Sequence, residues 1–176
     1  MSLITLYSSP NHSILTRCMK QEDKMSSPRH ILQLWFHMLN LPRQSHVSWH
    51  RARLREELCE RRLAETRWEK LSETLDVLFS VTRAQYDGFP TRNTICLSSI
   101  CFSPIYMYML AKYTSRWSFF KVAALFCNAR HWRLVNEVVN PSKDHKLVEV
   151  ASRHEMNQTN FQRVSRQLRR VWPLLP

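Results

Sequence analysis

The amino-acid sequence predicts an all-α protein: a small helical domain with one long amphipathic helix, an apolar aromatic hairpin and a C-terminal helix pair. The chain of 176 residues has a single glycine, Gly88, and few of the Asn-Gly or Asp-Gly pairs that close β-hairpins. From Trp49 to Arg83, neither proline nor glycine interrupts a sequence rich in the strong helix formers Arg, Glu, Leu and Ala. The 44% of hydrophobic residues is enough for a core, so we expect a folded helical domain.

The scarcity of glycine also excludes several classes of enzyme. Phosphate-binding loops, dinucleotide fingerprints and nucleophile elbows need glycine where the backbone approaches a ligand or takes a positive φ. Half of the carboxylates lie among balancing basic residues of the 48–83 stretch, and no Ser, His and Asp arrangement stands out. We therefore expect no catalytic activity and no cofactor.

The formal net charge of +12 and the pI near 10 indicate an anionic partner, which would be nucleic acid, acidic lipid or an acidic protein. The excess lies mainly at the C-terminal end, since residues 112–176 carry 12 basic and 4 acidic side chains. Five cysteines without a CxxC pair predict neither a disulfide framework nor a zinc module, and so favour an intracellular protein. Cys96, Cys101 and His131 could ligate a metal, but such apolar cysteines are more often core residues, and we predict no metal site.

Residues 1–47 are expected to form a basic, flexible N-terminal region that contains one short apolar helix. Four basic residues in an acid-poor setting suit a mitochondrial presequence as well as a disordered tail: Arg17, Lys20, Lys24 and Arg29. Between Pro28 and Pro42, the apolar run from Ile31 to Leu41 predicts a buried or docking helix.

Residues 48–84 are predicted to form the long amphipathic helix, the first element of a helical domain over 48–176. Apolar side chains follow one another there at spacings of 4, 3, 4 and 3, which is typical of a seam that packs on another helix: Ala64, Trp68, Leu71, Leu75 and Leu78. One hypothesis is therefore a scaffold that docks a protein partner through Trp68, Leu71 and Leu75.

The apolar segment over 93–127 has two interpretations. Its first part, Asn93 to Ala111, holds nineteen residues without a charge, but Pro104 and several serines make it marginal as a membrane span. Its second part, Lys112 to Phe126, is strongly aromatic, so the two parts could form a buried hairpin. The alternative is a membrane-associated protein anchored by residues 93–126.

A pair of helices over 142–172 contains the one motif-like pattern, with Ser142 and Asn157 as expected N-caps. The interior spacing resembles a helix-turn-helix: Ala151 where the helices approach, Met156 in the turn, and Phe161 and Val164 inward. Glu155 stands at the turn position that usually holds glycine, and Arg153 at a position where an apolar residue is expected. A helical hairpin with solvated arginines is the alternative.

The helix-turn-helix interpretation assigns a binding face. Four residues would face outward at the start of the second helix, where they can read base edges: Gln158, Thr159, Asn160 and Arg163. Three further arginines would contact phosphates: Arg166, Arg169 and Arg170.

The segments WEKLSETLDVLFSVTRAQYDG, KYTSRW, VNPSKDHKLVEVASRH and RQLRRVWPLLP resemble a family of uncharacterised proteins from filamentous fungi. The resemblance covers roughly residues 48–176 except an atypical patch rich in Ile, Cys and Ser at 94–103, which a retained intron would also produce. It implies no activity and no site residue. The leading hypothesis is thus a basic binding or adaptor protein of the nucleus, mitochondrion or a membrane, contacting nucleic acid through its C-terminal helices.

Overall fold

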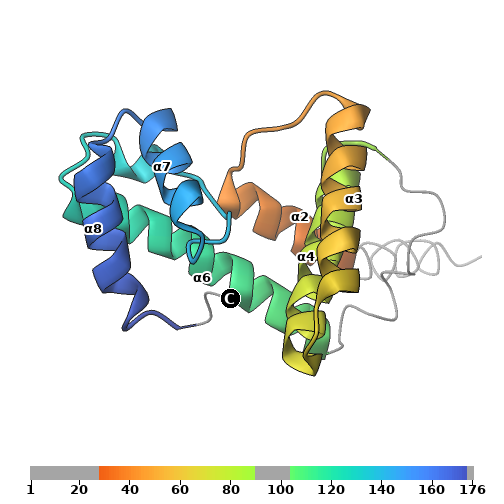
Figure 1. Ribbon diagram of the computed structural model, residues 1–176. Coiled ribbons are helices and arrows are strands. Elements are labelled where there is room, and N and C mark those ends of the chain that lie inside the picture. The colour runs from red at the N-terminus through yellow and green to blue at the C-terminus, as the bar shows by residue number, and fades with distance from the viewer. Residues whose placement is uncertain (1–27, 90–103, 174–176) are drawn as a thin grey trace, which may run out of the picture.

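The computed structural model describes residues 28–89 and 104–173, and it confirms the all-α prediction for them (Figure 1). These residues form six α-helices and one short 3-10 helix, with no strand. In chain order they are α2 (Pro28–Leu39), α3 (Val47–Leu63), α4 (Arg67–Tyr86), α6 (Pro104–Phe126), η1 (Trp132–Leu134), α7 (Asp144–Arg153) and α8 (Gln158–Arg169).

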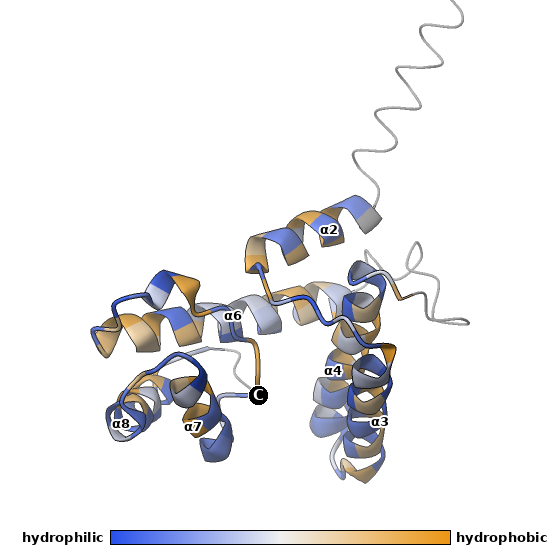
Figure 2. Cartoon of the chain, turned by 90° about the horizontal axis from the view of Figure 1, so that it is seen from above, coloured by the Kyte–Doolittle hydropathy of each residue, from blue (hydrophilic) through white to orange (hydrophobic). Residues whose placement is uncertain are grey.

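Helix α6 runs through the middle of the molecule, with α2, α3 and α4 at one end and α7 and α8 at the other, as Figures 1 and 2 both show. Its first half contributes to a core that we call the α2–α4 core. The buried members of that core are Leu32, Trp35, Phe36, Leu39, Leu75, Leu78, Phe79, Tyr106, Met109 and Tyr113. Its second half contributes to the α7–α8 core, which consists of Phe119, Phe120, Ala123, Ala124, Val135, Leu147, Val150, Ala151 and Phe161.

The predicted long helix over 48–84 is wrong in one respect, because the chain breaks between α3 and α4 and the two helices pack against each other. Thr66 begins α4 with a capping box: its Oγ1 accepts from the Glu69 amide at 3.1 Å, and Glu69 Oε2 accepts from the Thr66 amide at 2.9 Å. These two bonds satisfy amides that a new helix leaves open, so they favour a start at this point. The Thr-x-x-Glu spacing in the sequence was the signal for this break.

Helix α2 belongs to the folded domain rather than to a flexible region. Its indole Trp35 Nε1 donates to Thr114 Oγ1 of α6 at 2.9 Å, and Trp117 Nε1 of α6 donates to the Leu39 carbonyl at 3.0 Å. The predicted short apolar helix is therefore present, and the domain includes residues upstream of 48. The rest of the predicted flexible region, residues 1–27, lies outside the described residues.

The predicted aromatic hairpin, with one part over 93–111 and the other over 112–126, is wrong where the two parts join, because α6 continues through 111–112 without a turn. Residues 104–126 form one continuous helix, and residues 93–103, the rest of the predicted first part, lie outside the described residues. Among the helices that the structure describes, none has the length and apolar character needed to cross a membrane. Two cations of α6, Lys112 and Arg116, are buried and face α4.

Candidate nucleic-acid interface

The turn between α7 and α8 contains Glu155, Met156 and Asn157. Glu155 takes a left-handed backbone conformation, with φ of +53°, at the position where glycine is usual. The Met156 amide donates to the Ala151 carbonyl at 2.8 Å, which closes the end of α7. Asn157 then caps α8 as predicted, because its Oδ1 accepts from the Asn160 amide at 2.9 Å.

The inward side of this helix pair is apolar and rests on α6. Ala151 and Phe161 are fully buried, and the Phe161 ring stacks on Phe120 at a centroid distance of 6.4 Å. The predicted cap at Ser142 is wrong: α7 begins at Asp144, and its N-cap residue is Lys143, whose side chain makes no capping bond. The Ser142 amide instead donates to Asn140 Oδ1 at 2.9 Å, which places this serine in the preceding turn.

The four residues predicted to read base edges lie in the first two turns of α8. Gln158, Thr159 and Arg163 are exposed, whereas Asn160 is half-buried. Arg163 Nη2 donates to Asn160 Oδ1 at 2.8 Å, so this amide orients the guanidinium on the helix surface. The polar groups at the start of α8 are thus accessible to a ligand.

Two of the three arginines predicted to hold phosphates already contact a carboxylate. Arg166 donates from Nε and Nη2 to Asp144 Oδ2, at 3.2 and 2.6 Å, and Arg169 Nη2 donates to Asp144 Oδ1 at 2.7 Å. The hydrogen bonds from Arg166 and Arg169 hold the pKa of Asp144 below its ordinary value. Arg170 is exposed at the C-terminal end of α8. The sequence analysis had not identified Asp144 as part of this face.

The α7–α8 region has a basic surface. Residues 141–173 contain seven Lys and Arg against three Asp and Glu. A surplus of positive charge attracts a polyanion.

The predicted docking seam is divided by the fold. Trp68 is 80% exposed, whereas Leu71 is half-buried and Leu75 is fully buried in the α2–α4 core. Leu75 is therefore used inside the chain, and within the predicted seam only Trp68 lies largely open.

A buried polar network that the sequence analysis missed joins α4 to α6. Asp76 accepts from Lys112 Nζ at 3.1 Å, from the Tyr113 hydroxyl at 2.6 Å and from Arg116 Nη1 at 3.4 Å. Burial and the neighbouring Arg116 lower the pKa of Lys112 despite the attraction of Asp76. Lys112 also donates to the Ser72 hydroxyl at 2.7 Å, so its charge is well coordinated inside the protein.

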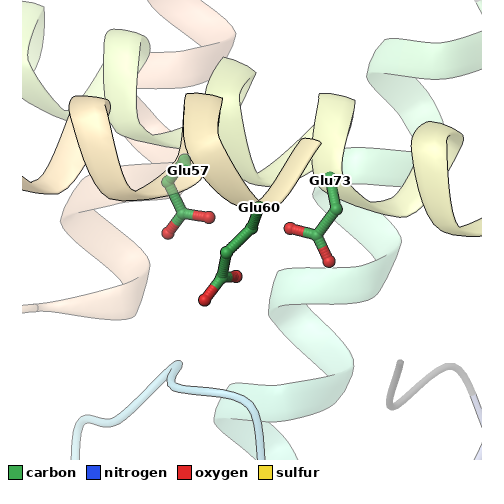
Figure 3. Close-up of side chains that lie close together, drawn as sticks. All are labelled: Glu57, Glu60 and Glu73. Atoms are coloured by element: carbon green, nitrogen blue, oxygen red, sulfur yellow. The ribbon is translucent and has the colours of Figure 1, made fainter. Parts of the chain in front are cut away.

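Three carboxylates lie together beside this network (Figure 3). One oxygen each of Glu57, Glu60 and Glu73 lies within 4.8 Å of the others, from helices α3 and α4. Arg53 pairs with Glu57, and Lys143 pairs with Glu60 at 3.2 Å, so protein cations balance two of the three. Burial raises the pKa of Glu57 to about 7 and also raises that of Glu73.

A cleft of about 610 Å³ separates α3 and α4 from α7 and residues 136–140. Its walls carry both charges, and the cations have partners: Arg83 Nε lies 3.1 Å from Asp87, and Arg153 Nη2 lies 3.1 Å from Glu137. The excess of basic charge is thus more available on α8 than in the cleft.

Comparison of the chain with protein-family models, with curated proteins and with solved structures finds no match. The candidate interface therefore stands on its own geometry.

Proposed function

We propose that the protein binds double-stranded DNA through the outward face of α8. The observation that carries this proposal is the start of α8, where Asn157 caps the helix and the side chains of Gln158, Thr159 and Arg163 are exposed. A helix held in this way can enter the major groove with its N-terminal residues toward the base edges.

The exposed side chains fit this role by their chemistry. The amide of Gln158 can pair with adenine, and the guanidinium of Arg163 can donate two parallel bonds to guanine. Arg170, at the other end of α8, supplies a positive charge for a backbone phosphate.

The test is a fluorescence-anisotropy titration of the full chain with a labelled random duplex of about 20 base pairs, roughly two helical turns. We expect affinity to fall steeply with salt, since each neutralised phosphate adds about −0.9 to the slope of log K against log salt. The double replacement Arg163→Ala and Arg170→Ala should weaken binding about tenfold or more and reduce the slope by about 1 to 2.

A matched control removes the same charge elsewhere. Arg51 and Arg55 are exposed on α3, at the other end of the molecule, and their double replacement by alanine should leave binding nearly unchanged. Equal losses in the two double variants would show that net charge alone attracts the duplex. A wild-type protein that binds no duplex even at low salt would refute the proposal.

A further inference from the structure

The contact between Asp144 and two arginines of α8 is a feature that the proposed function does not explain. A single carboxylate receives three hydrogen bonds from Arg166 and Arg169. Arg169 Nη1 donates in addition to the Ser142 carbonyl at 2.8 Å, which fixes its guanidinium beside the start of α7. Both guanidinium groups are therefore directed toward one anionic position.

Two of the three side chains in this contact are largely exposed, whereas Arg169 is 21% exposed. The Asp144 and Arg166 side chains are 46% and 54% exposed, and ion pairs between such exposed groups add little to stability in water. The contact also joins groups on the solvent-exposed surface of the helix pair and does not belong to the α7–α8 core.

The same two arginines suit a phosphate equally well. Arginine forms paired hydrogen bonds with carboxylate and with phosphate oxygens in closely similar geometry. A phosphodiester that approaches α8 would thus meet two arginines that already donate to Asp144.

We propose that Asp144 is a built-in competitor of DNA at the α8 face. It occupies Arg166 and Arg169 in the free protein, and DNA gains these two contacts only by displacing the carboxylate. This inference rests on the proposed function, and it adds that the contact of Asp144 with the two arginines lowers the affinity of the protein for DNA.

The test compares two variants that remove one negative charge each from α7. Asp144→Asn removes the competing charge, whereas Glu149→Gln removes an exposed charge that pairs with Lys146 on the same helix, at 3.2 Å. In the anisotropy titration, Asp144→Asn should tighten duplex binding by about three- to tenfold, and Glu149→Gln by less than about twofold. The slope of log K against log salt should also become steeper in Asp144→Asn, by the equivalent of up to about two neutralised phosphates.

A second pair of variants identifies the groups that carry the gain. When Arg166→Ala and Arg169→Ala are introduced together, the additional replacement Asp144→Asn should no longer tighten binding beyond the Glu149→Gln control. Circular dichroism of each variant checks that the helices are intact.

The outcomes separate the two proposals. If wild type and all variants bind no duplex, the proposed function fails, and the role of Asp144 fails with it. If wild type binds but Asp144→Asn binds equally or more weakly, DNA binding stands and the competitor is refuted. A gain that survives the loss of both arginines would also refute it.

Discussion

The two ends of helix α6 use charged residues in opposite ways. On the side of α4, Lys112 and Arg116 near the middle of the helix point inward and meet Asp76 in the interior. In its second half, the side chains that meet α7 and α8 are Phe and Ala, and the neighbouring ion pairs of Asp144 lie at the surface.

This difference separates the ion pairs of a strongly basic chain into those that hold the fold together and those that a ligand can replace. A buried ion pair is costly to break, because removal of one partner leaves an unpaired charge in the interior. A surface pair is cheap to exchange for another partner. The surface ion pairs of the α7–α8 end can therefore exchange their partner for a ligand more easily than the buried pairs of Lys112 and Arg116.

The largest expected effect comes from Asp76→Ala. The replacement leaves Lys112 and Arg116 in the interior without their carboxylate, and it should lower the free energy of unfolding by about 3–5 kcal/mol. Urea denaturation measures the change. As the comparison, Asp144→Ala at the other end should lower the free energy of unfolding far less, because Asp144 and Arg166 are largely exposed to solvent. Similar losses in both variants would contradict the contrast between the two ends.

A smaller effect concerns Glu57, which is 1% exposed and whose pKa burial raises to about 7. The folded protein then keeps this proton to a higher pH than the unfolded chain, so its free energy of unfolding falls as the pH rises from about 4.5 to 7. Glu57→Gln has no such proton to lose. At pH 8 its free energy of unfolding should exceed that of wild type by roughly 1–3 kcal/mol. This gain is smaller than the pKa shift alone would give, because Arg53 loses its charged partner.

The measurement for Glu57 is urea denaturation from pH 4 to 8. Glu56→Gln, an exposed neighbour that also pairs with Arg53 at 2.7 Å, should keep the wild-type pH dependence. A Glu57→Gln profile that falls as steeply as wild type would show that another group titrates.

The smallest expected effect is at the α7–α8 turn. Glu155→Gly places glycine at a position with a left-handed backbone, which glycine adopts without strain. The replacement should raise the free energy of unfolding by about 0.5–1 kcal/mol. Glu155→Ala removes the same side-chain charge but keeps a Cβ, so it should bring no such gain. Thermal unfolding of the two variants side by side tests this, and equal stabilities would mean that the turn carries no strain.

Local features of this fold were predictable from the sequence, and distant ones were not. The Asn157 cap was predicted from its place in the chain and is confirmed. Glu155, which departs from the glycine usual in this pattern, takes a left-handed conformation. A local signal for the break before α4 was also present, in the capping-box residues Thr66 and Glu69. The surrounding helix formers nevertheless favoured one continuous helix.

The buried network could not be predicted, because its members are far apart in the chain. Asp76 lies 36 and 40 residues from Lys112 and Arg116, and each of them alone looks like an ordinary surface charge. The pairing of Asp144 with α8 was hidden in the same way, since Arg166 is 22 residues away. Their positions depend on how whole helices pack.

Because α6 belongs to both cores, it couples the two ends of the molecule. A local opening that releases α7 and α8 still leaves the first half of α6 held by α2 and α4, and an opening at the other end leaves its second half held. Only global unfolding frees the whole helix. The backbone amides in the middle of α6 should therefore be the slowest to exchange with deuterium, and their exchange rate should report the stability of the entire domain.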